Sequence, residues 1–312
     1  MMLLSTREID ITPTRPCWQG GYVQRTEYYH KVNDPIMATI FVPNFEGVKM
    51  VWISMDISGV QQIFADAVIS KVRESGIVLE RKDIVFGATH THSGPLIGTY
   101  RDRKMDEEYF ESTVNKVANA IIQAWNDEGV EVSARYSSAQ IDGLYSNRND
   151  KNKLSDKTVS MIGFFKDEEL IALYYTMAHH CTVLGPNFMD LSADLFGRLR
   201  YELKKELGDI PVLMVQGNAG DMGNKQYRRA NIYSEVEYQA FNVMDQIRKK
   251  HTPWETIELS SLEYYEGSYK AIFDIETAPL KVKKAQFEKQ LETETDLDTI
   301  KLLKPGISSY ER

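Results

Sequence analysis

The sequence predicts an α/β fold in which helices flank a mixed β-sheet core. Apolar runs of strand length alternate with amphipathic stretches of helical length along most of the chain. Some strand-like runs follow one another directly, which favours a mixed sheet over a purely parallel one. The 312 residues are 42% hydrophobic and 26% charged, which is enough apolar material for a full-sized core. We expect one α/β domain over 1–312, with 276–312 as a solvated helical extension.

The first half of the chain is expected to hold five elements. These are strands over 36–43, 49–57 and 83–88 and helices over 58–75 and about 106–127. Ser58 and Gln61 fit a capping box at the start of the first helix, and Gly76 suits its end. The apolar stripe of that helix consists of Ile63, Phe64, Ala67, Val68 and Val72. The stripe of the second consists of Phe110, Val114, Val117, Ile121 and Trp125.

The second half continues the alternation of strands and helices. Strands are expected over 131–141, 159–166, 169–178 and 211–216 and as a pair near 257–275, and helices over 193–207, 233–250 and 280–303. The last helix is rich in charged residues, with a thin apolar stripe of Val282, Phe287 and Leu291. It therefore reads as a capping or connecting element outside the core.

Composition limits the class of protein. The net charge is −8, which argues against general nucleic-acid binding because that needs a basic surface. Two cysteines, Cys17 and Cys181, cannot form a disulfide framework. No apolar run is long enough for a transmembrane helix, and the N-terminus lacks the pattern of a secretory signal. A cytoplasmic protein is the default expectation, and a secreted one stays open if a signal has been removed.

Four polar clusters follow or open predicted elements. They are Thr89–Ser93, His179-His180, Ser192–Asp194 and Gly217–Asp221. Structural alternatives stay open. His90 and His92 could be a pair of hydrogen-bonded loop histidines, Asp194 an acid favoured by a helix N-terminus, and Asp221 a turn residue. Outside the four clusters, Asn147-Arg148 could be an exposed loop pair. Because strand ends are where open α/β sheets place their sites, four such clusters together favour a functional site.

Histidines dominate these clusters. Side chains two residues apart on a strand point the same way, so His90 and His92 are expected to share one face. A catalytic zinc site uses about three protein ligands and one open position. His90 and His180 could each supply one nitrogen for metal-assisted hydrolysis, with Asp221 taking a proton from water. Arg148 and His92 could then hold substrate oxygens.

At this point the sequence resembles the N-terminal domain of the neutral/alkaline non-lysosomal ceramidase family. The matching pieces stand in the family's order over roughly residues 8–225. They are IDITPTRP, VWISMDISG, GATHTHSGP, SNRN, AHHCTVLGP with LSAD, and QGNAGDMGN. GATHTHSGP is the most specific of them. Six pieces in register make a chance resemblance unexpected, and the resemblance implies the fold of that domain.

The resemblance implies a zinc-dependent amidase of sphingolipid metabolism, which cleaves the amide between a fatty acid and a sphingoid base (an N-acylsphingosine amidohydrolase). If the residues of the matching motifs have the same roles here as in the family, His90 and His180 would be zinc ligands. His92 and Arg148 would line the substrate site, and Asp221 would sit beside the water on the zinc. The expected partner is a small-molecule or lipid amide, and the sequence carries no signal for an oligomeric state.

Two departures from the family pattern matter. Gly223 stands where the ceramidases have the serine of Gly-Asp-x-Ser, which weakens ceramide as the substrate more than it weakens hydrolysis. The family's later glutamate and tyrosine ligands have no match before Arg312, and Glu266 is too poor a match to assign. The chain is then a fragment, a shortened relative, or a protein in which another residue, such as Asp194 or Asp221, completes the site.

Three functional hypotheses remain. The first is a zinc-dependent hydrolase of a linear amide. The second is a catalytically impaired relative that acts as a binding or structural protein, which the missing ligands motivate. The third is a metal hydrolase of esters or phosphates that uses the same loops, since a fold does not fix a function. Basic residues near His90 would favour phosphate, and the sequence shows none next to it.

Overall fold

The computed structural model describes residues 2–101, 103–258, 277–296, 299–300 and 303. The chain divides into two compact units. The first consists of residues 1–21 and 27–263, and the second of residues 22–26 and 264–312. The expected single domain over 1–312 stays a prediction.

The first unit contains a ten-stranded sheet with five strands in each half. One half holds β1 (Met2–Asp10), β2 (Met37–Phe45), β3 (Val48–Lys49), β4 (Val51–Met55) and β5 (Ile84–Ala88). The other holds β6 (Val130–Gln140), β8 (Thr158–Lys166), β9 (Glu169–Met177), β10 (Val212–Gln216) and β12 (Glu255–Thr256). The main strand order is β10-β9-β8-β6-β1-β2-β4-β5. The pairs β9/β10 and β4/β5 are parallel and the others antiparallel, which confirms the mixed sheet.

The sheet folds over so that its two halves face each other. They are joined where β1 pairs with β6 over three residues, Met2–Leu4. On the far side, β10 packs against β2, β4 and β5, and the Ser54 hydroxyl of β4 donates to the Met214 carbonyl of β10. An apolar layer that includes Phe41 and Phe164, whose rings meet edge to face, fills the space between the halves.

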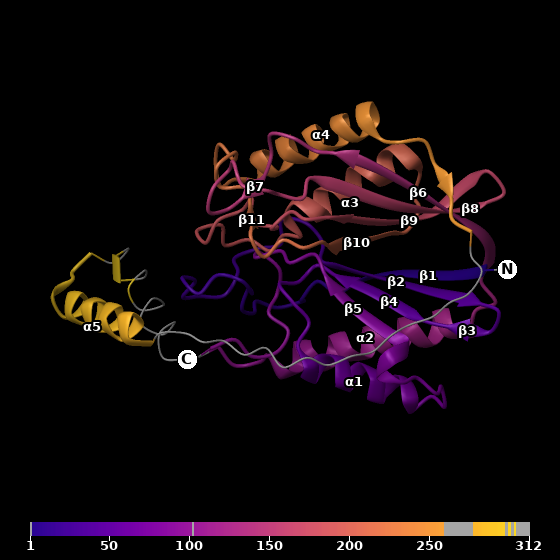
Figure 1. The fold of residues 1–312 in the computed structure, drawn as a ribbon. Helices are drawn as coiled ribbons and strands as arrows, with labels where there is room; N and C mark the ends of the chain where they lie inside the picture. The colour runs from indigo at the N-terminus through magenta and orange to yellow at the C-terminus, as the bar shows by residue number, and fades with distance from the viewer. Residues whose placement is uncertain (1, 102, 259–276, 297–298, 301–302, 304–312) are drawn as a thin grey trace. The chain divides into compact units, whose positions relative to one another are not determined.

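Helices cover both outer faces of the folded sheet, which gives four layers in the order helix, sheet, sheet, helix (Figure 1). One face carries α1 (Gln62–Arg73) and α2 (Glu107–Asn126), and the other α3 (Asp194–Leu207) and α4 (Tyr233–Lys250). Phe110, Val114, Val117 and Ile121 of α2 are buried as predicted, because their spacing places them on one helix face. The α/β architecture with flanking helices is therefore confirmed.

The start of α1 differs from the prediction. Its N-cap is Gln61, and no side chain caps the helix, so the predicted capping box is wrong. The Gln61 side-chain amide instead bonds to the backbone of Thr99, and Ser58 lies in a loop before the helix. Ile63, predicted in the apolar stripe, is 54% exposed.

The second unit contains α5 (Thr277–Thr293), which covers most of the helix expected over 280–303 before a break at 294–296. Val282 is exposed, while Phe287 and Leu291 are half-buried. The strand pair expected near 257–275 falls mostly on residues 259–276, which lie outside the described residues, as does Glu266. Among the helices of the described ranges, none has the length and apolar character needed to cross a membrane.

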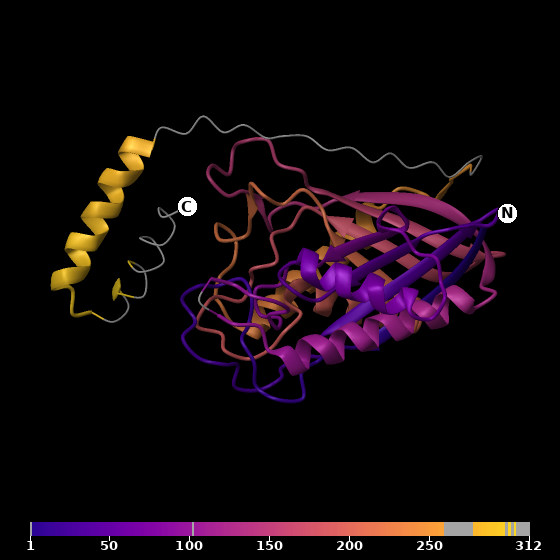
Figure 2. The ribbon, with the colours of Figure 1, turned by 90° about the horizontal axis from the view of Figure 1, so that it is seen from below.

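The loops that carry the polar clusters leave the sheet at one end. β5 leads into Thr89–Ser93, β9 into His179-His180, and β10 into Gly217–Asp221. Figure 2, seen from below, shows the long loops of the first unit gathered at the end remote from the N-terminus. Because β5 and β10 lie in facing halves of the sheet, this end brings together residues that are far apart in the sequence.

Candidate metal centre

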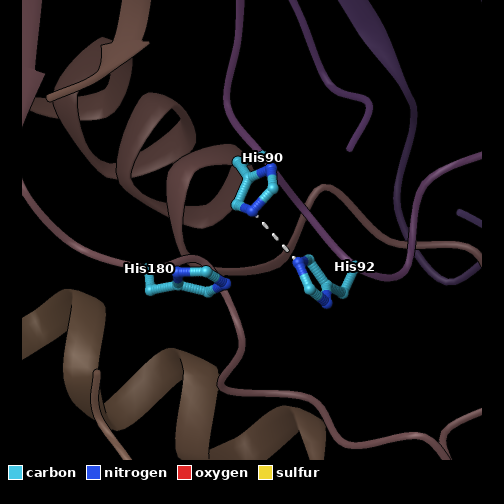
Figure 3. Close-up of side chains that lie close together, drawn as sticks. All are labelled: His90, His92 and His180. Carbon is cyan, nitrogen blue, oxygen red and sulfur yellow. Dashed lines mark hydrogen bonds between the residues drawn. The ribbon is translucent and has the colours of Figure 1, made fainter. Parts of the chain in front are cut away.

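Three histidines from two loops meet at this end of the sheet. His90, His92 and His180 each offer a ring nitrogen, and these nitrogens all lie within 4.8 Å of one another (Figure 3). The ring centroids are 4.7 Å apart for His90–His92, 4.7 Å for His90–His180 and 5.2 Å for His92–His180. Among the histidine, cysteine, aspartate and glutamate side chains of the described residues, these three form the group of three or more that lies close enough to share a metal ion.

His90 and His92 meet for a different reason than predicted. The strand β5 ends at Ala88, and His90 adopts a left-handed backbone with φ of 60°. The turn at His90 brings the two Nε2 atoms to 3.2 Å, so a loop conformation replaces strand alternation as the cause. Non-glycine residues rarely adopt this backbone, and those that do concentrate at functional sites.

The second nitrogen of His90 is fixed by the chain that follows β4. Nδ1 of His90 bonds to the backbone carbonyl of Ser58. A carbonyl oxygen can only accept, so Nδ1 carries the proton and Nε2 keeps its lone pair. Metal-binding histidines typically have this arrangement, in which a backbone carbonyl sets the tautomer.

Gly21 makes room for His92, which sequence reasoning missed. Its backbone has φ of 84°, and a Cβ atom there would lie 2.4 Å from Cγ of His92. Only glycine fits such a close approach with this backbone. The Gly20-Gly21 pair in the sequence was the available signal, although nothing in the sequence linked it to His92.

His180 has two competing neighbours at Nδ1. Nη2 of Arg148 lies 2.7 Å away and the Ala219 carbonyl oxygen 3.2 Å away. The guanidinium can only donate and the carbonyl can only accept, so one tautomer of His180 satisfies one neighbour at a time. The tautomer with its proton on Nδ1 faces Ala219 and leaves the lone pair on Nε2.

The Asn147-Arg148 loop and the glycine-rich turn meet through two short strands, β7 (Ser146–Asn147) and β11 (Met222–Gly223). Asn147 donates to Oδ2 of Asp221 at 2.9 Å, and the Arg148 amide donates to the Asp221 carbonyl at 2.7 Å. A Cβ atom on Gly223 would lie 3.1 Å from Cβ of Arg148. The structure thus brings Asp221 and Arg148 together, with Arg148 reaching His180, while Asp221 lies outside the histidine group.

Asp194 does not join the histidines either. It is fully buried, and its two carboxylate oxygens accept hydrogen bonds from the amides of Leu184 at 3.1 Å and Leu195 at 2.7 Å. The group of metal-capable side chains does not include it. Both oxygens of Asp194 accept from backbone amides. Asp194 therefore bonds to the surrounding backbone and does not lie where a ligand of the histidine group would lie.

Burial favours the neutral form of two rings of the group, His90 and His180. It lowers the pKa of His180 to about 4, with the positive charges of Arg148 and Lys225 acting in the same direction. Burial also lowers the pKa of His90. Neutral imidazole is the form that binds a metal ion, so the surroundings favour metal binding over protonation.

Comparison with known proteins gives a likeness of fold. No family model matches the chain, and no curated protein matches it. The crystal structure of neutral ceramidase from Pseudomonas aeruginosa superposes with a TM-score of 0.70 at 17% identity, covering 80% of this chain and 44% of that one. A ceramidase complexed with C2 gives a TM-score of 0.70 at 16% identity, with 80% and 43% covered. The chain therefore has this fold and spans less than half the length of either protein.

Proposed function

We propose that the chain is a metal-dependent hydrolase in which His90, His92 and His180 hold Zn²⁺. The approach of three ring nitrogens within 4.8 Å carries this proposal. Zinc–nitrogen distances of about 2.0–2.1 Å in a tetrahedral site separate two ligand nitrogens by roughly 3.3 Å. The 3.2 Å between Nε2 of His90 and Nε2 of His92 fits that separation. Three histidines with one open position are a ligand set of catalytic zinc.

His92 takes a different part here from the substrate-lining role expected for it. With His90 and His180 alone the site would bind zinc weakly, and His92 supplies the third nitrogen from within the chain. When bound, zinc would act as a Lewis acid and make a nucleophile available near neutral pH. The other steps belong to residues of the two neighbouring loops.

Arg148 is proposed to bind a substrate oxygen. If His180 holds its Nδ1 proton toward Ala219, Nη2 of Arg148 loses its acceptor on the ring and can donate to a substrate carbonyl. Nε of Arg148 stays anchored on the Met222 carbonyl at 3.1 Å. Asp221, held by Asn147, is the proposed base that accepts a proton from water.

The proposed substrate is a lipid or small-molecule amide. The two structural neighbours are ceramidases, which supports an acyl amide as the substrate. In hydrolysis, water oxygen bonds to the acyl carbon, the carbon–nitrogen bond breaks and the amine leaves with a proton. Gly223, where the ceramidases have serine, keeps the proposal at the level of the amide class.

A second candidate, hydrolysis of esters or phosphates, is favoured by one observation. The charges of Arg148 and Lys225 both act on His180, although the sequence next to His90 shows no basic residue. Cations beside a metal site suit a substrate that carries negative charge. A substrate panel separates this candidate from the amidase.

Metal content and hydrolysis test the proposal together. The unchanged chain and the His90→Ala/His180→Ala double variant are analysed for metal by plasma mass spectrometry and assayed on N-acyl amides, esters and phosphate monoesters. We expect zinc in the unchanged chain, loss of zinc in the variant, and metal-dependent cleavage of amides. Retained metal without any hydrolysis would favour a binding protein, and activity in the double variant would contradict the site.

A further inference from the structure

The buried segment Ser192–Asp194 contacts both histidine loops. The Ser192 amide donates to the Ser93 carbonyl at 3.0 Å, and the Thr91 hydroxyl donates to the Ser192 carbonyl at 2.9 Å. Thr91 and Ser93 flank His92, so these bonds fix the chain on both sides of that ring. Ser192, Thr91 and Ser93 are all fully buried, which excludes water as a competing partner.

Asp194 connects the same segment to the loop that begins at His180. Its Oδ2 accepts from the Leu184 amide at 3.1 Å and its Oδ1 from the Leu195 amide at 2.7 Å. The direct bond between the two histidine loops, from the His92 amide to the Cys181 carbonyl, is long at 3.4 Å. The Asp194 side chain therefore connects α3 to the His180 loop by a bond that is shorter than the direct one between the two histidine loops.

The residue that makes this connection, Asp194, has a strained backbone. Its φ is 53°, and the Ser192 hydroxyl accepts its amide at 2.9 Å. A left-handed backbone and a buried carboxylate are each unfavourable, and they persist where the surroundings fix them. The left-handed backbone thus occurs both at the histidine loop, in His90, and at the segment that supports it, in Asp194.

We propose that Asp194 is a positioning residue of the metal centre, which holds the His180 loop at the separation from His90 and His92 that a shared metal ion needs. This inference rests on the proposed function, because it assumes that the three rings bind one ion. It assigns a role to the one cluster, Ser192–Asp194, that the proposed hydrolysis leaves unused. Asp194 acts through His180 and touches neither metal nor substrate.

Titration with Co²⁺ tests the inference. Asp194→Asn replaces one carboxylate oxygen with an amide NH₂, which faces a backbone N–H and cannot accept from it. We expect Co²⁺ to bind the variant at least about tenfold more weakly, the scale seen when support of a metal ligand is lost, with an altered visible absorption. Asp106→Ala is the matched control, since it removes a carboxylate that accepts a backbone amide at the start of α2 and that pairs with Arg15 instead of with a histidine loop.

A second readout works without metal. The ring signals of His90, His92 and His180 in proton–nitrogen spectra should move in metal-free Asp194→Asn and stay unchanged in Asp106→Ala. Unchanged affinity and unmoved ring signals in Asp194→Asn would overturn the inference. If the unchanged chain binds no Co²⁺, the proposed function fails, and the ring signals still decide the role of Asp194.

If Asp194→Asn does not fold, a milder variant tests the same inference. Ser192→Ala removes the hydroxyl that accepts the Asp194 amide and leaves the carboxylate in place. It should weaken Co²⁺ binding in the same direction and by a smaller factor. Wild-type affinity and spectrum in folded Ser192→Ala would then count against the inference.

Discussion

His92 separates the proposed site from the one that the sequence resemblance implies. If His92 is a ligand, His92→Ala should lower zinc affinity by at least about a hundredfold, beyond the 10–100-fold typical of residues that only support a ligand. If His92 only lines the substrate site, zinc should stay bound and turnover alone should fall. Competition with a chelator of known affinity measures the difference. Full zinc affinity in His92→Ala would contradict its assignment as a ligand.

Asp221 is expected to affect turnover and leave metal binding intact. Asp221→Asn keeps an oxygen that can accept from Asn147 and removes the charge that would take a proton. We expect zinc content to be unchanged and kcat to fall by on the order of a hundredfold or more, the usual scale for a lost general base. Steady-state kinetics on the best amide, beside zinc analysis, checks this. An unchanged kcat would remove Asp221 from the mechanism.

Gly21 should be required for the position of the His92 ring. Gly21→Ala adds a Cβ 2.4 Å from Cγ of His92 to a backbone with φ of 84°. We expect weaker zinc binding together with a loss of stability of about 1–3 kcal/mol from backbone strain. Gly47→Ala is the matched control, because its φ is 91° and no atom lies within 4 Å of the added Cβ. Denaturant unfolding and zinc titration should show a stability loss in both variants and an affinity loss in Gly21→Ala alone.

At the scale of elements, Asp194 at the start of α3 should make the free energy of unfolding depend on pH. Burial raises the pKa of Asp194 to about 7, although the amides of Leu184 and Leu195 act in the opposite direction. In the unfolded chain an aspartate has a pKa of about 3.9. Between about pH 4 and pH 7 the folded protein therefore keeps a proton that the unfolded chain has already released. The part of the unfolding free energy that depends on protonated Asp194 is complete below about pH 4 and is lost as pH rises through 7.

Removing the Asp194 carboxyl removes that dependence. We expect the metal-free protein to lose more of its unfolding free energy between pH 5 and pH 8 than metal-free Asp194→Asn loses. Urea unfolding of both proteins at the two pH values, with a chelator present, gives the comparison. An equal change in the two proteins would mean that Asp194 does not titrate in this range.

The element bounds were largely predictable because apolar periodicity is local. Buried positions on α2 and the stop of α1 before Gly76, whose φ is 86°, follow from residues a few positions apart. The capping box at Ser58 failed because the loop before α1 bonds to His90 and Thr99, which lie more than 30 residues away. Local pattern cannot show such a competing partner.

The candidate site was predictable in its residues and less so in their arrangement. Motif resemblance pointed to His90 and His180 as ligands and to His92, Arg148 and Asp221 as residues of the substrate site, and the structure brings these loops to one end of the sheet. The third ring of the group depends on the left-handed backbone of His90, which no sequence period predicts. Asp194 was a candidate ligand by proximity in the motif, and only its bonds to Leu184 and Leu195 reveal a different use.

At the scale of the first unit, the folded sheet explains why the site forms. His90 follows β5 in one half of the sheet and His180 follows β9 in the other, and the packing of β10 against β2, β4 and β5 holds the two halves together. Strand-like runs that follow one another directly predicted a mixed sheet, yet they could not predict that it folds over, because that depends on contacts such as Phe41 with Phe164. The approach of the three histidines is thus a consequence of the four-layer arrangement.

The most direct test of the central claim is X-ray absorption at the zinc edge, measured on the chain loaded with one equivalent of Zn²⁺. A centre built by His90, His92 and His180 predicts three imidazole ligands per zinc in the unchanged chain. It predicts two in His92→Ala. Absence of bound zinc, or two imidazoles in the unchanged chain, would contradict it.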